Sequence, residues 1–565
     1  MQNFKDYFDS EMRSLTEIGE SFSKSYPEQA GLLNLNSVKD RDPYVERLLE
    51  GVAFLTGQIR QRIDDCIPEI SGSVLEQLCG SLIRAYPSTS IVEYKLNAYA
   101  PKAVSLADQQ VLKAVNTGPK KIECHYSTTN SVAIQPLIIT SVTNYAGTSS
   151  ATEIKISFTK SSNASWSEID FSALELYLHA DWPVSYALFQ LLSDHSTKGV
   201  FQQDSVSGKI MVSFDANHID AKHNILPNDG REHAAFSILH DYFCARERFL
   251  FFSINCDRQR FLNDNDNNIE LKVSSNLPLP VDTNLTSDNI HINCTPVVNL
   301  VSADAQAIRI DHSRSEFLLK TEINDGDCYQ VYSVERLTSR DQVTGQNYEY
   351  NPIYAMHYQD KGARSFSSRH SVSVAESPVT YISVSSALPF NPEVLSTEIK
   401  LTNGQYPRRY MDVNSIAQTV SAIPKEIQVY NIVRPTKSFQ VPSHHDFQWQ
   451  LISLLTLQLS MIDSSEKLQR LLSLFDWSDQ IENKRKIQSI EKVSLEHFQR
   501  FNRGILFQGQ ELCLQLNEKY FSSESDCYLF ASVLHAFFTA LSDLNQVTQT
   551  KVTLIPSYKE WVWKP

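Results

Sequence analysis

The amino-acid sequence predicts a multidomain α+β protein, with a helical segment first, two β-rich domains in the middle and a mixed α/β domain last. The helical prediction rests on apolar residues that recur every three or four positions over residues 1–90. The β prediction rests on the alternation of apolar and polar residues that begins after Pro87. A length of 565 residues is also more than one hydrophobic core usually organises.

The first predicted helix lies near the N-terminus. Its apolar face ends at Tyr26 and Pro27, because proline lacks the N–H that would continue the helix. Residues three or four apart form this face: Phe4, Phe8, Met12, Leu15, Ile18 and Phe22. A face this wide must be buried against something.

A second helix is predicted from Asp42 to about Ile67 and Pro68. Asp42 can cap the first turn, and Pro43 stands where its missing N–H costs nothing. One face is apolar and consists of Tyr44, Val45, Leu48, Leu49, Val52, Leu55, Ile59 and Ile63. The other is charged and includes Glu46, Arg47, Glu50, Arg60, Arg62 and Asp64. The apolar face must be covered by the helix's own domain or by another chain.

A third helix is predicted from Ser73, which forms a possible capping box with Glu76, to Pro87. Residues 1–90 are therefore interpreted as a helical assembly segment and not as an enzyme domain.

Residues 91–262 and 263–433 are predicted to form two β-rich domains. Alternating segments in the first domain include 91–98, 154–158 and 210–214, and one helix is expected near 236–243 before a strand over 248–254. In the second domain the expected strands include 307–310, 329–334 and 398–402.

Residues 434–565 are predicted to form a mixed domain. Helical spacing of apolar residues occurs over 446–461, 466–475 and 528–544. Strands are expected around Leu506, over 512–516 and over 551–555.

Composition and charge exclude several classes of protein. A net charge of −14 argues against a large nucleic-acid-binding surface, and the best basic cluster, Lys484 to Lys486, is interpreted as a solvated surface. The nine cysteines are scattered without paired metal-ligand spacing, which predicts reduced thiols. The polar N-terminus predicts no signal peptide, and the apolar stretch 451–462 is too short to span a bilayer. We therefore expect a cytoplasmic protein without membrane insertion.

A search for catalytic and metal-binding motifs finds no phosphate-binding loop, nucleophile elbow or zinc-protease signature. Asp264, Asp266 and Asn268 imitate the start of a calcium loop but lack its glycine and closing glutamate, so a surface turn is the better interpretation. Cys124 and His125 would point to opposite faces of a strand. The histidine pair His444 and His445 lacks further zinc ligands nearby. We expect no metal, no cofactor and no enzyme activity.

A hydrolase remains the alternative, because the sequence cannot show whether distant carboxylates converge. Asp64 and Asp65 do not make such a site, since neighbouring residues on a helix diverge by about 100°. A third possibility, an exported adhesin or carbohydrate-binding module, is disfavoured by the thiol content and the absence of a leader sequence.

Two groups of residues are candidate protein-binding surfaces. The first is the predicted helical bundle surface: Phe8, Met12, Leu15, Asp42, Pro43, Tyr44, Arg47, Leu48, Glu50, Leu55 and Ile59. The second is C-terminal and aromatic: Phe530, Phe537, Phe538, Trp561 and Trp563. Core packing is the alternative for the second group, because buried aromatic side chains usually serve their own domain. An exposed tryptophan would instead suit a partner's groove.

Several stretches of the sequence together resemble a known family. The run Asp42-Pro43-Tyr44-Val45-Glu46-Arg47-Leu48-Leu49-Glu50-Gly51 with Ala53-Phe54-Leu55 is similar to the N-terminal signature of the TssF family, the F subunit of the bacterial type VI secretion baseplate. Shorter similar stretches follow in order, among them 240–243, 249–252, 293–300, 331–334, 401–404 and 530–549.

The resemblance implies a structural role without catalysis. Family members resemble phage baseplate wedge proteins, and two F subunits pair with one TssG-type subunit in a wedge that also holds TssK-type subunits. Wedges gather around the spike and hub, contact a sheath-associated TssE-type subunit, and dock on the membrane complex at the inner face of the inner membrane. The N-terminal helices would then belong to a bundle shared between two F copies and G.

Overall fold

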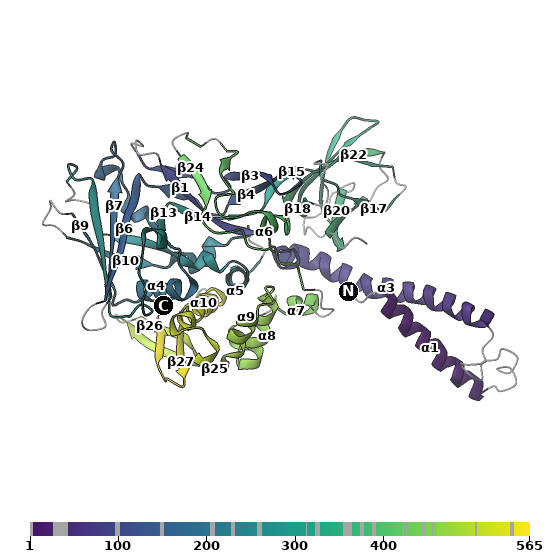
Figure 1. Cartoon of the computed structure of the whole chain (residues 1–565). Helices are drawn as coiled ribbons and strands as arrows, with labels where there is room; N and C mark the ends of the chain where they lie inside the picture. Colours follow the sequence, from purple (N-terminus) through teal and green to yellow (C-terminus); the bar gives the residue numbers. More distant parts are fainter. Residues whose placement is uncertain are drawn as a thin grey trace. The chain divides into compact units, whose positions relative to one another are not determined.

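A computed structural model gives the fold of the chain (Figure 1). It describes residues 4–25, 43–96, 102–146, 152–203, 209–227, 232–256, 263–311, 314–322, 328–353, 364–372, 378–386, 391–421, 423–424, 427–442, 447–454, 457, 459–502, 505–542 and 547–564. Contacts divide the chain into two units. Unit 1 comprises residues 1–77 and 442–454, and unit 2 comprises residues 78–441 and 455–565.

Unit 1 is helical in its described part. It contains α1 (Phe4–Ser25), α7 (Phe447–Leu454) and all but the last two residues of α3 (Pro43–Cys79). The predicted end of the first helix is confirmed, because α1 stops before Pro27. The predicted start of the second is confirmed as well, with Pro43 as the first helical residue of α3.

The break predicted at Pro68 is wrong. Helix α3 runs for 37 residues and passes through Pro68, Ser73 and Glu76, so the separate third helix and its capping box do not form. An internal proline removes one backbone hydrogen bond and costs about 3 kcal/mol. A helix this long keeps its other backbone bonds, so the proline does not end it.

Unit 2 contains a six-stranded sheet. Its order is β23 (Gln418–Thr419), β3 (Val111–Thr117), β4 (Ile122–Thr128), β14 (Cys294–Val298), β1 (Thr89–Leu96) and β24 (Ile427–Asn431). Val92, Tyr126 and Val429 are among the residues of its core. Helix α6 (Tyr406–Tyr410) and the pair β2 (Val104–Leu106) with β5 (Val132–Ile134) complete this region.

The first eight-stranded sheet lies largely within 137–292. Its order is β13 (Ile290–Ile292), β8 (Glu175–Leu178), β11 (Phe251–Cys256), β10 (Lys209–Asp215), β9 (Lys198–Gln202), β12 (Asn268–Ser275), β7 (Thr152–Lys160) and β6 (Leu137–Ala146). Helices α4 (Trp182–Ser193) and α5 (Ala234–Cys244) belong to the same stretch, and α5 confirms the helix expected near 236–243. The strand expected from Arg248 begins only at Phe251, because residues 246–250 form a 3₁₀ turn.

The second eight-stranded sheet uses residues 301–402. Its order is β15 (Val301–Asp304), β22 (Glu393–Thr402), β18 (Gln330–Asp341), β19 (Asn347–Pro352), β20 (Arg364–Val372), β21 (Pro378–Ser386) and β17 (Glu316–Leu318), with β16 (Ile308–Ile310) also paired to β22. Leu337, Ile382 and Leu395 lie in its core.

The sheets do not follow the boundary predicted at residues 262/263. The six-stranded sheet joins β1, β3 and β4 to β14, β23 and β24, so it takes strands from both sides of that boundary. Backbone hydrogen bonding makes a sheet one structural unit, and local alternation of residues carries no information about which distant strand will pair.

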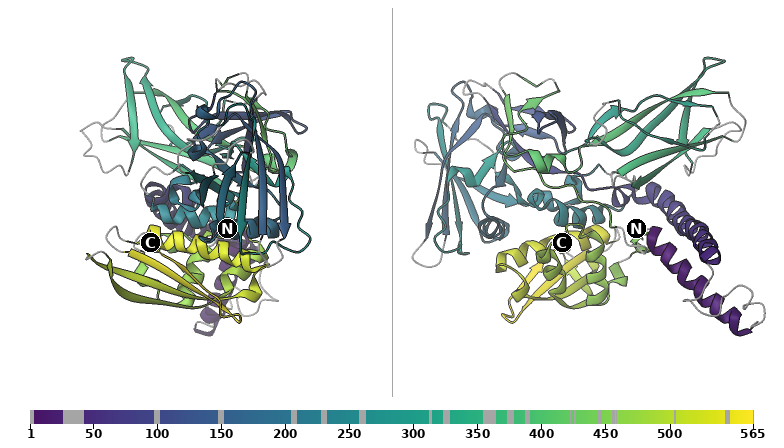
Figure 2. Two further views of the ribbon diagram at one scale, coloured as in Figure 1. Left: turned by 90° about the vertical axis from the view of Figure 1, so that its left-hand side faces the viewer. Right: turned by 45° about the vertical axis from the view of Figure 1, so that its right-hand side comes forward.

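The C-terminal part of unit 2 is a four-stranded sheet with helices. The strands are β25 (Ile490–Asn502), β26 (Ile505–Asn517), β27 (Val547–Ile555) and β28 (Glu560–Trp563). Strands β26 and β27 are parallel, and α10 (Glu524–Leu541) is the crossover that a parallel pair needs. Helices α8 (Ser465–Phe475) and α9 (Ile481–Gln488) precede the sheet. Figures 1 and 2 show α10 along one face of the strands.

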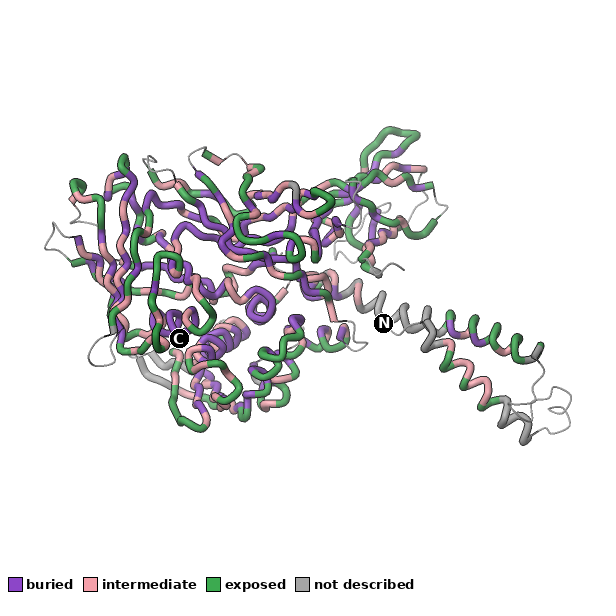
Figure 3. Tube along the Cα trace, in the orientation of Figure 1, coloured by how far each residue is buried: buried purple, intermediate pink, exposed green. Residues whose placement is uncertain are grey.

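Helix α10 is the best-buried helix of this region. It packs against α4, α5 and β27, and Figure 3 shows most of it in the colour of buried residues. Its first turn is anchored by an ion pair in which the Lys486 ammonium lies 2.6 Å from the Asp526 carboxylate, with both side chains fully buried. The interpretation of Lys484 to Lys486 as a solvated surface is therefore wrong for Lys486. Helical spacing in α9 turns this one lysine inward, and Asp526 compensates its charge.

Candidate partner-binding surfaces

The apolar stripe of α3 is exposed in unit 1. Tyr44 is 78% exposed, Leu48 68%, Leu55 60% and Ile59 60%. The buried residues of this stretch are the small Ala53 and Gly57. Within the described part of the chain, the side chains of this stripe, which were predicted to be covered, are thus largely exposed (Figure 3).

The other bundle candidates take varied positions. Phe8, Met12 and Leu15 of α1 are half-buried, whereas Arg47 and Glu50 of α3 are exposed. Asp42 lies outside the described residues, and Pro43 is described only as the first residue of α3. The structure therefore brings the candidates onto two helices but does not bury them together.

The three C-terminal phenylalanines are core residues. Phe530 is 1% exposed, and Phe537 and Phe538 are fully buried. Their prediction as interface residues is contradicted, because side chains enclosed by α10's own neighbours cannot reach a partner in this fold. The alternative weighed from the sequence, core packing, explains them.

The two C-terminal tryptophans are different. Trp561 and Trp563 lie on the short strand β28 and remain half-exposed. The Tyr528 ring of α10 packs 5.1 Å from the Trp561 ring and 5.3 Å from the Trp563 ring, and Trp563 stacks on His535 at 6.2 Å. They form an aromatic patch that is partly open to solvent.

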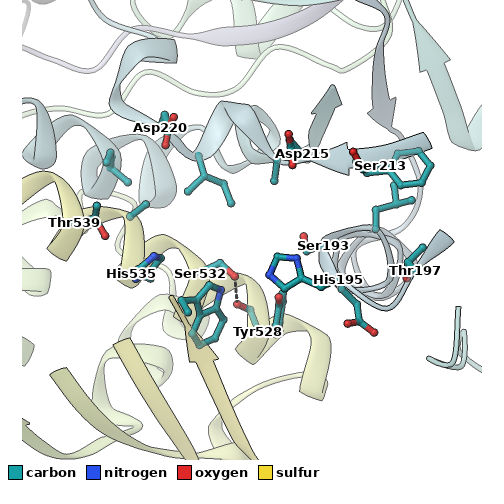
Figure 4. A pocket seen from close by; sticks show the side chains of 18 of the residues that line it. Ser193, His195, Thr197, Ser213, Asp215, Asp220, Tyr528, Ser532, His535 and Thr539 are labelled. Carbon is teal, nitrogen blue, oxygen red and sulfur yellow. Dashed lines mark hydrogen bonds between the residues drawn. The ribbon is translucent and has the colours of Figure 1, made fainter. Parts of the chain in front are cut away.

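Trp563 also lines a cavity of about 480 Å³ in unit 2 (Figure 4). One wall is a polar stripe of α10 formed by Tyr528, Ser532, His535 and Thr539. The facing wall comes from the end of β10 and the turn after it, and a third from the C-terminal end of α4. Sequence reasoning missed this site. Small and polar residues spaced three or four apart on an otherwise apolar helix were the available signal.

His535 is held neutral at the cavity wall. Its Nδ1 lies 2.9 Å from the hydroxyl of Thr550, a fully buried residue. Burial lowers the pKa of His535 to about 4. The ring therefore adds no positive charge to the cavity near pH 7.

Converging buried carboxylates would favour a hydrolase, but those among the described residues contact a cation or accept hydrogen bonds from neighbouring groups. Glu393 contacts Arg364 and accepts hydrogen bonds from Tyr350 and Ser339. Asp241 contacts Arg248 and accepts a 2.8 Å hydrogen bond from the Tyr86 hydroxyl.

Glu93 is a third such carboxylate. Tyr430 donates to it at 2.6 Å, and His291 Nδ1 lies 3.1 Å away. Burial opposes its ionisation, but these hydrogen bonds outweigh burial and lower the pKa of Glu93. In the described part of the chain, these buried carboxylates are thus engaged by groups of their own fold, and no hydrogen bond joins two of them.

One group could offer ligands to a metal ion among the residues that the structure describes. Glu496, Glu511 and Cys513 on the β25–β26 hairpin place their ligand atoms within 4.8 Å of one another. Glu496 and Glu511 are direct cross-strand partners, and Glu511 accepts a 2.8 Å hydrogen bond from Gln549. Exposed carboxylates on a hairpin occur without ions, so this group supports no assignment.

Two of the metal candidates named from the sequence lie among the described residues, and each has a structural explanation. Asp264 accepts hydrogen bonds from the backbone of Trp166 at 2.7 Å and the hydroxyl of Ser165 at 2.8 Å, as expected of a structural turn. Cys124 is buried while His125 is half-buried on the other face of β4. His444 and His445 lie outside the described residues. A search of the described helices finds none with the length and apolar character needed to cross a membrane.

These features define a class of protein. Its described buried charges are matched by groups of its own fold, and the longest described helix presents apolar side chains to solvent. This is the architecture of a structural subunit of a larger assembly.

The comparisons with known proteins name the family. The model of the family described as "Type VI secretion system, TssF" matches residues 1–565, so the chain belongs to the TssF family. TssF1 of Pseudomonas aeruginosa, a type VI secretion system component, is 23% identical over 594 residues, which cover 96% of this chain and 95% of that protein. The resemblance inferred from the sequence is confirmed.

Solved structures of type VI secretion baseplates contain chains of the same fold. A chain of the type VI secretion TssK-TssF-TssG baseplate subcomplex, seen by cryo-electron microscopy, is 28% identical, with a TM-score of 0.81 over 92% of this chain and 98% of that one. A chain of the type VI secretion baseplate complex is 23% identical with a TM-score of 0.65 over 100% and 99%, which shows the shared fold. The α+β prediction and the structural role in the type VI secretion baseplate are both confirmed.

Proposed function

We propose that this chain is a baseplate wedge subunit that uses the exposed stripe of α3 to join a helical bundle with a TssG-type subunit and a second copy of itself. The observation that supports this most strongly is the exposure of Leu48, Leu55 and Ile59 on one face of a 37-residue helix. Burying each such side chain contributes about 1.5–3 kcal/mol. A helix of this length extends roughly 55 Å and can present several anchors to a partner groove.

The partners follow from the relatives. The solved subcomplex that this chain resembles contains TssK and TssG beside TssF. We extend this to TssK-type and TssG-type subunits as partners here, with two copies of this chain for each TssG-type subunit. Contacts with the spike and hub, with a TssE-type subunit and with the membrane complex at the inner face of the inner membrane complete the proposal. A non-catalytic role fits the described buried carboxylates, which contact cations or accept hydrogen bonds within the fold.

The test is Leu48→Asp in the full-length chain co-expressed with its TssG-type partner. Leu48 is 68% exposed, so the chain alone should fold as before, while a carboxylate enclosed in the bundle should cost several kcal/mol. We expect a two-to-one complex from the unmodified chain and its loss from the variant, measured by size-exclusion chromatography with light scattering.

Val281→Asp is the matched control, because Val281 is 91% exposed and belongs to unit 2, whereas Leu48 belongs to unit 1. It makes the same change of charge and should leave the complex intact. If Leu48→Asp assembles as well as Val281→Asp, the α3 stripe is not the interface.

A further inference from the structure

The cavity beside α10 is a second candidate binding site, independent of the α3 stripe. It lies within unit 2, where α10 packs directly on α4 and α5. Its volume of about 480 Å³ falls in the range of cavities that take a small ligand or a partner's side chain. Figure 4 shows His535, Ser532 and Thr539 on one wall and Asp215 and Asp220 on the facing one.

The cavity has an excess of negative charge. The described residues that line it include Asp194, Asp215 and Asp220 but no lysine or arginine. The C-terminal end of α4, which closes one side, adds the partial negative charge of its last carbonyl groups. A cationic group is the complement of such a lining.

The three cavity carboxylates can accept further hydrogen bonds. The Asp220 carboxylate makes no hydrogen bond to other described residues, although its backbone carbonyl accepts one from Arg248. The charge of Arg248 is itself matched by the buried Asp241. One oxygen of the Asp215 carboxylate accepts a hydrogen bond from the Asn255 side-chain amide. The Asp194 carboxylate accepts one from the backbone N–H of Ser196. Each retains acceptor sites, since an ionised carboxylate offers about four.

The spacing of the cavity carboxylates does not suit a metal ion. Among the described residues, the three-ligand group within 4.8 Å is the distant Glu496, Glu511 and Cys513, so the cavity carboxylates do not converge as metal ligands do. Carboxylates on one wall and the Trp563 and Tyr528 rings on another suit a longer organic cation that can reach both. A guanidinium stacks on aromatic faces and reaches carboxylates with several N–H groups at once.

We propose that the cavity lined by Tyr528, His535, Trp563, Asp215 and Asp220 binds an arginine side chain presented by a partner protein. The aliphatic part of the side chain lies against Trp563, and its guanidinium reaches the carboxylates of the facing wall. The volume leaves room for the residues that flank the arginine. The site is a charge-selective contact, in contrast to the apolar stripe of α3.

The experiment uses the full-length chain labelled with 5-fluorotryptophan, with the Trp563 signal assigned through Trp563→Phe. The probe is the peptide acetyl-Ala-Arg-Ala-amide, and the comparison peptide carries citrulline, which has nearly the same shape without the charge. We expect the fluorine signal of Trp563 to shift and saturate with the arginine peptide. The citrulline peptide should bind about fivefold more weakly or not measurably.

Two matched variants separate specific binding from general attraction to an acidic protein. Asp215→Asn with Asp220→Asn should weaken binding about fivefold, whereas Asp282→Asn with Asp304→Asn makes the same charge change at exposed positions outside the cavity and should not. Equal binding of the citrulline peptide, an equal loss in both double variants, or an unmoved Trp563 signal would each overturn the proposal. Tighter binding of a norleucine peptide would overturn it in favour of an apolar occupant.

Discussion

Helices α3 and α10 carry similar apolar patterns and have opposite surroundings. In α10 the apolar side chains at 530, 534, 537 and 538 are at most 1% exposed, enclosed by α4, α5 and β27. In α3 the stripe that begins at Tyr44 and Leu48 is mostly in solvent. Periodicity therefore shows that a helix has an apolar face, but it does not show what covers that face.

The two helices differ in the packing partners that their own chain provides. The four-stranded sheet and its helices give α10 partners in its own chain, because the β26–α10–β27 crossover places the helix on the sheet. The described part of unit 1 offers α3 only α1, α7 and its own small residues, such as Ala53 and Gly57. An exposed apolar face of this kind typically marks a protein interaction site.

The largest expected effect is on α10. Phe537→Ala removes a fully buried ring and should lower the free energy of unfolding by about 3–5 kcal/mol, since the surrounding helices cannot close the cavity completely. Urea unfolding followed by circular dichroism measures this. A loss below about 1 kcal/mol would show that α10 is not enclosed in solution and would erase the contrast with α3.

An intermediate effect concerns the pH dependence of the core beneath α10. His240 of α5 is buried against Tyr86 and Trp477, and burial lowers its pKa to about 3, well below the value near 6.5 in an unfolded chain. Between those values only the unfolded chain takes up the proton. Stability from this residue is therefore complete above pH 6.5 and falls by about 1.4 kcal/mol per pH unit as the pH drops toward 3.

His240→Phe should flatten that dependence, because phenylalanine takes up no proton in either state. The measurement is the midpoint of thermal unfolding at pH 7, 6, 5 and 4 for both proteins, where the difference between them should shrink or reverse as the pH falls. Parallel curves would mean that His240 titrates normally and is not enclosed.

The smallest expected effect is on α3. Leu55→Ser changes a side chain that is 60% exposed and should alter the free energy of unfolding of the isolated chain by no more than about 0.5 kcal/mol. The same urea measurement as for Phe537→Ala applies. A loss of several kcal/mol would mean that the chain covers the stripe itself, which would weaken the case for a partner there.

Local signals in the sequence were sufficient where local chemistry decides. Pro27 and Pro43 fixed the end of α1 and the start of α3, and apolar spacing located α5 and α10. The same signals failed at Pro68, which is carried within α3. They also gave no warning of α4, whose residues are buried nearly all round and so show no amphipathic face.

The candidate sites divide in the same way. The α3 stripe was predicted by residue spacing and is present on the surface, although what covers it remains a proposal. The phenylalanines of α10 were misassigned, because aromatic residues on a helix look alike whether they meet their own core or a partner. The cavity at His535 went unpredicted, since its walls come from residues more than 300 positions apart.

The sequence by itself determined the class of the fold, the ends of most helices, the apolar stripe of α3 and membership of the TssF family. Only the tertiary structure decided which strands share a sheet, that Lys486 is buried against Asp526, and that Asp215 and Asp220 face His535 across a cavity. The physical reason is the distance along the sequence over which each feature is decided. Helix starts, stops and faces depend on residues a few positions apart, whereas burial and charge pairing depend on which distant segments meet.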